Sequence, residues 1–333
     1  MTLKKSLLEV KNLKINFKTY EGLSKVVDGI NLIVHEGDSV GLVGESGCGK
    51  TITARTILGI LPSPPAQITG KILFKGKNIL EEKKSSKRPR FAFIPQEAMN
   101  SLSHFFTVQN QMTDLITYQT SSLSFLRLIK NVGETKNVGA TAKALESLDL
   151  VGIPDPSRVI KNYPFELSGG MRQRIFIALS LISDCPLIIA DEPTTQLDVL
   201  TQAQIVELMR QKVKGQNISM LYITHNLGIA RTLCDIIYVM YAGQILEIAT
   251  TQRLFENSKH PYTKALIDAI PKISAPMSKG LKGGVPEYYN PPSGCRFHPR
   301  CKYSMKVCKQ LKPELLELEH GHKVACYLHK AEC

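Results

Sequence analysis

The sequence lacks an apolar run long enough to cross a bilayer. Its longest candidates, residues 175–182 and 236–240, fall well short of the roughly 20 residues that a membrane-spanning helix needs. Residues 1–10 carry two lysines but no apolar stretch of signal-peptide length, and they resemble the start of a strand. We therefore expect a cytosolic protein that does not itself span a membrane.

The sequence also has no internal repeat and no compositional mark of disorder or of a fibrous protein. Its 333 residues are 43% hydrophobic, with a mean hydropathy of −0.07, which is ordinary for a globular chain. At roughly 100 to 200 residues per domain, this length allows one large α/β domain with an insert or appendage.

Acidic residues are scarce toward the C-terminus. Residues 259–330 hold 13 Lys and Arg against 5 Asp and Glu, and so supply most of the net charge of +13. A solvated basic surface is one interpretation, and attraction to anionic lipid headgroups beside a membrane partner is another. Binding to nucleic acid is less favoured, because no basic motif with interleaved aromatic residues accompanies the charge.

The hydrophobic pattern predicts alternating strands and helices. Alternating apolar residues at 7–17 and 26–34 predict two strands of an antiparallel layer. Prolines 62, 64 and 65 should end a helix over 51–60. The alternation of the remaining segments favours a parallel sheet with helices on its faces. We expect strands at 39–43, 71–74, 187–190, 219–223 and 236–240, and further helices at 108–115, 140–150, 169–182 and 202–213.

A phosphate-binding motif follows the predicted strand at 39–43. Residues 44–51 fit the pattern G-x-x-x-x-G-K-[ST], whose backbone N–H groups cradle phosphates. The glycines let the backbone approach the anion closely. Lys50 should reach the β and γ oxygens of a nucleotide, and Thr51 should bind Mg²⁺. The expected ATP contacts are Gly44, Glu45, Ser46, Gly47, Cys48, Gly49, Lys50 and Thr51.

Two adjacent acids follow the apolar run at 187–190. They stand at the C-terminal end of a predicted strand, where ligands bind in α/β sheets. Asp191 is expected to hold Mg²⁺ through water, and Glu192 to polarise the attacking water as general base. A strand that merely ends in a polar turn before Pro193 is the alternative, which the phosphate-binding motif disfavours.

Residues 167–174, Leu-Ser-Gly-Gly-Met-Arg-Gln-Arg, resemble the signature sequence of ATP-binding-cassette (ABC) ATPases. The Ser168 hydroxyl and the amides of Gly169 and Gly170 would form an anion site at a helix N-terminus. The resemblance implies that this signature, including Gln173, faces the γ-phosphate held by a second ATPase subunit. Dimerisation would then depend on ATP.

Smaller matches to the same family complete the set. Gln96 resembles the Q-loop glutamine, which in the family senses Mg²⁺ and the γ-phosphate, and His225 resembles the switch histidine. Residues 195–198 resemble the D-loop ending in Asp198, although Gln196 stands where relatives usually have alanine. The family stacks an aromatic residue on adenine; Phe17 and Tyr20 are the candidates, and Tyr20 is preferred.

The C-terminal part narrows the resemblance to the ATPases of dipeptide/oligopeptide importers. Residues 259–266, Lys-His-Pro-Tyr-Thr-Lys-Ala-Leu, carry it, as do 269–271 and 292–301. The chain departs from the family where an Asn-Pro pair is missing at 100–104, and where a proline is missing at 301–303.

The resemblance implies an ATPase subunit, at the cytoplasmic face of the membrane, that drives uptake of di- and oligopeptides. Its partners would be a second ABC ATPase, two transmembrane permease subunits and an extracytoplasmic substrate-binding protein. Nickel or antimicrobial peptides are alternative cargoes. An ABC ATPase acting on nucleic acid or ribosomes is less favoured, because the chain has one phosphate-binding loop, one signature and a modest insert.

The implied fold is an α/β P-loop NTPase core of ABC ATPase type with an antiparallel β layer. Residues 1–96 would form the first half of the nucleotide-binding core and 167–271 the second half. Between them, residues 97–166 are polar with helical spacing and would form a helical subdomain. A proline and glycine cluster marks the start of a small Cys-rich accessory segment at 272–333.

Four of the eight cysteines fall in this last segment: Cys295, Cys301, Cys308 and Cys326. We expect them to bind a structural [4Fe–4S] cluster, because four thiolates in a reducing cytosol suit one. Zinc is the alternative, although its sites usually contain short C-x2-4-C pairs that are missing here. Unligated thiols are the third possibility. The other cysteines, Cys48, Cys185, Cys234 and Cys333, show no ligand spacing.

Overall fold

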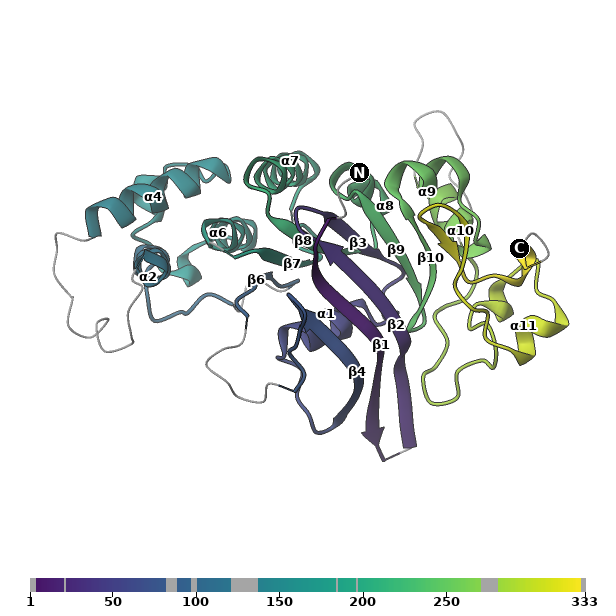
Figure 1. The fold of residues 1–333 in the computed structure, drawn as a ribbon. Helices are drawn as coiled ribbons and strands as arrows, with labels where there is room; N and C mark the ends of the chain where they lie inside the picture. The colour runs from purple at the N-terminus through teal and green to yellow at the C-terminus, as the bar shows by residue number, and fades with distance from the viewer. Residues whose placement is uncertain are drawn as a thin grey trace. The chain divides into compact units, whose positions relative to one another are not determined.

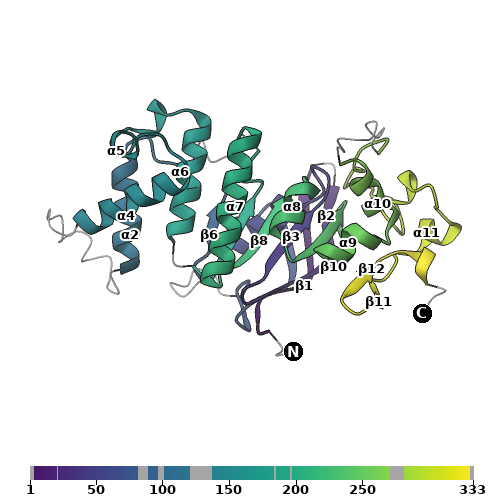
Figure 2. The same ribbon diagram turned by 90° about the horizontal axis from the view of Figure 1, so that it is seen from above.

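The computed structural model describes residues 4–20, 22–81, 89–96, 101–120, 137–183, 185–195, 197–270 and 281–330. The chain divides into two compact units. The first unit comprises Met1–Pro89 and Ser219–Cys333, and the second comprises Arg90–Ile218. Figures 1 and 2 show the elements of both units from two directions.

An antiparallel sheet in the first unit is built from the two strands that alternation predicts. The strand order is β2-β1-β4-β5. A register shift between Val10 and Leu13 resets the alternation of β1, so that the apolar residues on either side of it stay buried. The strands are β1 (Ser6–Thr19), β2 (Gly22–His35), β4 (Ala66–Phe74) and β5 (Lys77–Asn78).

The predicted parallel sheet is confirmed in the same unit. Strand β3 lies between β8 and β9 and runs parallel to both, and every residue of β3 and β8 is buried. Strand β10 then pairs antiparallel with β9. These strands are β3 (Ser39–Val43), β8 (Ser219–Thr224), β9 (Ile236–Tyr241) and β10 (Gln244–Thr250).

Short helices follow these strands along the chain. The first helix ends at Leu58 rather than at the prolines, because Gly59 adopts a left-handed conformation with φ 69° and closes it. The helices are α1 (Lys50–Leu58), α8 (Leu227–Leu233), α9 (Thr251–Asn257) and α10 (Pro261–Asp268).

The C-terminal segment extends the core sheet, which the sequence pattern does not predict. Its strand β12 (His322–Val324) pairs with β10, and β11 (Leu316–Glu319) pairs with β12 (Figure 2). The pairing of β12 with β10 joins Glu247 to Val324 and Ile248 to Lys323. A strand this short has too few residues to show a hydrophobic periodicity in the sequence. A buried hydrogen bond of 2.7 Å between His322 Nε2 and a Glu247 carboxylate oxygen anchors it. The segment also holds the helix α11 (Lys306–Gln310) and the single turns η4 (His298–Arg300) and η5 (Tyr327–His329).

The second unit holds a parallel pair of strands and the longest of the described helices. Strands β6 (Ala92–Ile94) and β7 (Leu187–Asp191) pair in parallel, and α2 packs against α4 (Figure 1). The predicted helices are confirmed, but α7 begins earlier than expected because Asp198 caps its N-terminus. The helices are α2 (Val108–Thr120), α4 (Asn137–Leu150), α5 (Pro156–Val159), η3 (Pro164–Glu166), α6 (Gly169–Ile182) and α7 (Val199–Gln216).

Two sequence-based expectations bear on this architecture. Among the described residues, no helix has the length and apolar character required to span a membrane. The division into segments at 96, 166 and 271 stays a prediction; the unit that contains α2 and α4 also contains β6, β7 and α6.

Candidate ATP-binding and catalytic site

The phosphate-binding motif forms the turn between β3 and α1. Gly44 must lack a side chain, because a Cβ there would lie 2.0 Å from the carbonyl oxygen of Met240. Gly49 has φ 106°, which an L side chain rarely adopts. The loop closes around the ammonium of Lys50, which is 4% exposed and donates to the carbonyls of Gly44 at 2.7 Å and Glu45 at 2.9 Å. The loop carbonyls thus fix the Lys50 ammonium where the sequence predicts a phosphate.

The switch histidine candidate follows the neighbouring strand. Because β3 and β8 are parallel, their C-terminal ends meet at one edge, and the Gly44 N–H donates to the Thr224 carbonyl at 3.4 Å. His225 comes next and is exposed, in the turn before α8. Asn226 caps that helix through its side-chain oxygen, which fixes the turn.

The adenine-stacking candidates lie at the end of the β1–β2 hairpin. Tyr20 is fully exposed and Phe17 is half-buried. Exposure of a large aromatic ring suits a stacking role, but the choice between the two stays a prediction.

The second unit brings two predicted catalytic residues together. Asp191 ends β7 and Glu192 follows it, and they are 1% and 8% exposed. Gln96 follows the adjacent parallel strand β6. The Gln96 Nε2 atom donates to Glu192 Oε2 at 3.5 Å. Glu192 adopts φ 46°, a left-handed conformation that is costly for a non-glycine residue and recurs at functional sites.

The signature residues open α6 as expected. Ser168 is the N-cap, and its oxygen accepts from the Met171 N–H at 3.3 Å, with Gly169 and Gly170 in the first turn. The role of Gln173 toward a nucleotide stays a prediction. Its side chain is fully buried and donates to the Pro193 carbonyl, because it stands on the face of α6 that packs inward. It ties α6 to the turn after β7.

The D-loop aspartate caps a helix. Asp198 accepts from the Thr201 N–H at 3.0 Å at the start of α7. Hydrogen bonds from the backbone and side chain of Thr201 hold the pKa of this exposed carboxyl below its usual value. Gln196 and Asn100, where the sequence departs from the family, lie outside the described residues, as does Cys333.

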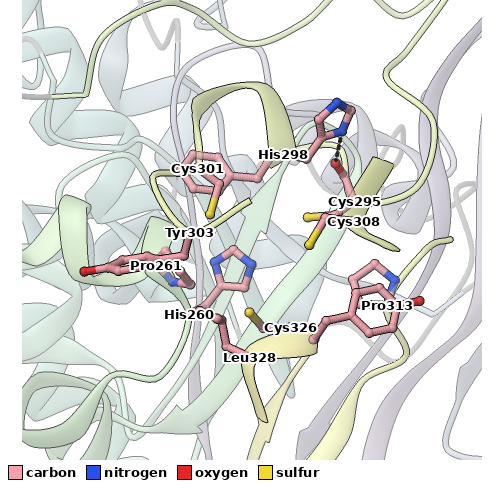
Figure 3. Close-up of a pocket in the computed structure, with 12 residues that line it drawn as sticks. His260, Pro261, Cys295, His298, Cys301, Tyr303, Cys308, Pro313, Cys326 and Leu328 are labelled. Carbon is pink, nitrogen blue, oxygen red and sulfur yellow. Dashed lines mark hydrogen bonds between the residues drawn. The ribbon is translucent and has the colours of Figure 1, made fainter. Parts of the chain in front are cut away.

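The four C-terminal cysteines line a single cavity (Figure 3). Burial raises the pKa of Cys295 to about 12 and that of Cys326 to about 11. His298 contacts the Cys295 carbonyl at 3.0 Å, and His260 also faces the cavity. Within the described part of the chain, no group of three or more His, Cys, Asp or Glu side chains is arranged to hold a single metal ion.

Sequence reasoning missed a set of contacts that α10 and the C-terminal segment make with the phosphate-binding loop. Tyr262, Tyr288 and Arg300 hydrogen-bond to Glu45 or Gly47 of the loop. Their positions in the sequence, more than 200 residues from the loop, give no signal of this.

The loop after β3, the acid pair after β7 and the signature at α6 are the features of an ABC-type ATPase. The family described as ABC transporter matches residues 27–195, and the chain belongs to it. Its activity is ATP hydrolysis coupled to transport. The chain belongs more narrowly to the ATP-binding subunits of dipeptide/oligopeptide ABC transporters, since the oligopeptide/dipeptide transporter C-terminal region matches residues 246–308.

Similar proteins cover nearly the whole chain. A probable peptide ABC transporter ATP-binding protein, y4tR, of Sinorhizobium fredii is 40% identical, with 96% of this chain and 94% of that protein covered. The dipeptide transport ATP-binding protein DppD of Caldanaerobacter subterraneus is 37% identical, with 97% of each covered. The oligopeptide transport ATP-binding protein AppD of Bacillus subtilis is 39% identical, with 98% of each covered.

The fold is similar to that of a solved dimeric ATP-binding cassette in a post-hydrolysis state bound to ADP and phosphate. The TM-score is 0.61 at 24% identity, covering 74% of this chain and 99% of that one. This likeness supports the fold of an ABC ATPase.

Proposed function

We propose that this chain is the peripheral subunit, at the cytoplasmic face of the membrane, that drives import of di- and oligopeptides. The assignment of a peptide cargo is supported by the match of residues 246–308 to the oligopeptide/dipeptide transporter C-terminal region. The similarity of the chain to peptide transport proteins supports it as well. Nickel or antimicrobial peptides are the second candidate cargo, because the cargo is selected by other subunits.

The partners follow from the same proposal. A second ABC ATPase would supply the signature that completes the nucleotide site of this chain, and two permease subunits would form the path through the membrane. An extracytoplasmic binding protein would deliver the peptide. The signature supports this arrangement. Ser168 caps the start of α6, and this glycine-containing helix start is an anion site. It is far in sequence from the phosphate-binding loop of the same chain, which suits a contact with the nucleotide of a partner.

Each predicted residue has a role in the proposed reaction. The loop at 44–51 binds the phosphates, with Lys50 reaching the β and γ oxygens, and Glu192 takes the proton from the attacking water. Gln96 orients Glu192 through their hydrogen bond. His225 contacts the γ-phosphate, and Tyr20 stacks on adenine.

The oxygen donors of the chain fit Mg²⁺, a hard cation that prefers oxygen ligands. Thr51 offers a hydroxyl, Gln96 an amide oxygen and Asp191 a carboxylate, which is 1% exposed and sits at a strand end. When bound, the ion offsets the charge of the phosphates.

The cargo and the partners can be tested together. Affinity purification of the tagged chain from its native membrane should recover a second ATPase, two permeases and a binding protein. The binding protein should retain peptides when its ligands are released and identified by mass spectrometry. Recovery of a binding protein that retains nickel would replace the peptide assignment, and recovery of ribosomes or nucleic acid without permeases would contradict transport.

We also propose that Cys295, Cys301, Cys308 and Cys326 hold a structural [4Fe–4S] cluster. Their convergence on one cavity supports a shared ligand. Zinc, which can also be held by four thiolates, is the alternative ligand. Four thiolates are equally the ligand set of a [4Fe–4S] cluster. A bound cluster would also stabilise thiolates that burial otherwise disfavours.

Anaerobic purification with iron, sulfide and zinc analysis tests this assignment. We expect iron and sulfide in equal amounts and their loss in Cys308→Ser, with Cys185→Ser, outside the cavity, as the matched control. A colourless protein with stoichiometric zinc would replace the cluster by zinc, and a metal-free protein would contradict both.

A further inference from the structure

Helix α10 and the C-terminal segment hold the phosphate-binding loop at several points. The Glu45 N–H donates to the hydroxyl of Tyr262 at 3.0 Å, and the Glu45 carboxylate pairs with Arg300. The hydroxyl of Tyr288 donates to the Gly47 carbonyl at 2.6 Å. We propose that Arg300 and Tyr288 are positioning residues that hold the phosphate-binding loop in its ATP-receptive shape. This inference rests on the proposed role of that loop.

The pair of Arg300 and Glu45 has the geometry of a strong interaction. Two nitrogens of the guanidinium meet the two carboxylate oxygens at 2.6 and 3.0 Å. The Arg300 side chain is 8% exposed, so water screens the pair weakly. Its guanidinium also lies 5.6 Å from the centroid of the Tyr241 ring and donates to the Tyr241 hydroxyl at 3.4 Å.

Glu45 needs this partner because of where it stands. It places a negative charge inside a loop that has to bind a polyanion, and an unpaired carboxylate there would repel the phosphates. Arg300 offsets that charge and fixes the side chain. The backbone of Glu45 is fixed at the same time by Tyr262, which is buried and packs against the rings of Tyr241 and Phe297 at 4.8 and 5.2 Å.

Tyr288 supports the tip of the loop. Gly47 is exposed with φ 81°, and none of the described residues comes within 4 Å of the place where a Cβ would stand on it. The tip therefore has little packing of its own, and the hydrogen bond from Tyr288 constrains it. Tyr288 is itself tied to β2, because its carbonyl accepts from the Lys25 N–H at 2.8 Å.

The anchor for Arg300 is the turn η4, which lies between Cys295 and Cys301. The Cys295 N–H donates to the Cys308 carbonyl at 2.9 Å, which ties this turn to α11. The same short stretch of backbone thus lines the cysteine cavity and carries the guanidinium that pairs with the loop.

Nucleotide binding to the assembled complex tests the proposal, with a fluorescent ATP analogue as the probe. We expect Arg300→Gln to raise the Kd about tenfold or more, since it leaves Glu45 unpaired. The KM for ATP should rise with it, while kcat at saturating ATP stays near the parental value. Tyr288→Phe removes one hydrogen bond to the loop and should raise the Kd about threefold. Arg253→Gln is the matched control, because Arg253 ties α9 to the C-terminal segment through His320 and Glu319 instead of the loop.

A double variant separates positioning from general support of the fold. Adding Glu45→Gln to Arg300→Gln removes the unpaired charge and should recover part of the lost affinity, which a merely structural role would not do. The inference would be overturned if Arg300→Gln and Tyr288→Phe bound the probe with the parental Kd while Lys50→Ala bound it more weakly. A Lys50→Ala variant that binds the probe like the parent would instead overturn the nucleotide site. If Arg300→Gln does not fold, the Kd of Tyr288→Phe is compared with those of the parent and of Lys50→Ala, and that comparison alone tests the inference.

Discussion

Gln96 and Glu192 are joined by a hydrogen bond of 3.5 Å across the ends of two adjacent parallel strands. The bond runs from an amide nitrogen to a carboxylate oxygen, and it links the candidate Q-loop glutamine to the acid that follows β7. The φ of 46° at Glu192 turns the chain at this point. A carboxylate held from both its backbone and its side chain is oriented before substrate arrives, as a general base must be.

Replacing Glu192 with Gln should leave ATP binding intact and lower turnover about 100-fold or more, because the water loses its base. Single-turnover hydrolysis and nucleotide binding by the assembled transporter measure the two effects separately. Glu207→Gln is the matched control, since Glu207 is exposed on α7 and pairs with Arg210. Parental turnover in Glu192→Gln would mean that another group is the base.

Replacing Lys50 with Ala should weaken ATP binding, in contrast to Glu192→Gln. The ammonium of Lys50 is the cation around which the loop closes, and its loss removes a charge-assisted contact to the phosphates. Equilibrium titration with a fluorescent ATP analogue measures the change, for which we expect about tenfold or more. Unchanged affinity would show that the nucleotide binds elsewhere.

Ser168 should act on the nucleotide of the partner subunit. In a mixed complex, Ser168→Arg in this chain should block hydrolysis of ATP bound by the other ATPase, because a bulky cation fills the anion site. The change also removes the N-cap of α6, so the free energy of unfolding should fall by about 1 kcal/mol. Photolabelling each subunit under turnover conditions locates the trapped nucleotide. Trapping confined to the site of Lys50 in the same chain would contradict the arrangement.

The ion pair between Asp28 and Lys312 should make stability depend on pH. Burial opposes ionisation of Asp28, but hydrogen bonds from Gln244 and Lys312 outweigh it and lower the pKa. The pKa of Asp28 is lower in the folded than in the unfolded protein, so the ionised carboxylate stabilises the fold at pH values above the unfolded pKa. The contribution disappears as the pH falls through the folded pKa. Lys312→Met should therefore lower the Tm at about pH 7, and the difference should shrink as the pH falls below the ordinary Asp pKa of about 3.9. A difference that stays constant as the pH falls would contradict this.

Much of the fold follows from local patterns. Alternation predicts β1 and β2, because a strand buried on one face alternates apolar and polar residues. Continuous apolar runs predict β3, β7, β8 and β9, because a strand buried on both faces is apolar throughout. Strand β12 leaves no such pattern, since it is short and is anchored by one buried hydrogen bond between His322 and Glu247 of β10. The end of α1 at Gly59 was similarly hidden by the more conspicuous prolines that follow.

The candidate site divides in the same way. The loop at 44–51 and the acid pair are contiguous in sequence, so their chemistry can be predicted from residue types and spacing. The inward-facing position of Gln173 depends on which face of α6 is covered, and a motif does not state that. The pairing of Arg300 with Glu45 joins residues 255 positions apart and can be found only in the folded chain.

The most direct measurement of the central claim is coupled transport by the reconstituted complex. Vesicles that contain this chain, its partner ATPase, both permeases and the binding protein should take up a labelled peptide only with ATP. Hydrolysis should rise when the binding protein is loaded, and both uptake and stimulated hydrolysis should be lost with Glu192→Gln. Peptide uptake that continues at the parental rate with Glu192→Gln, or without ATP, would contradict the account.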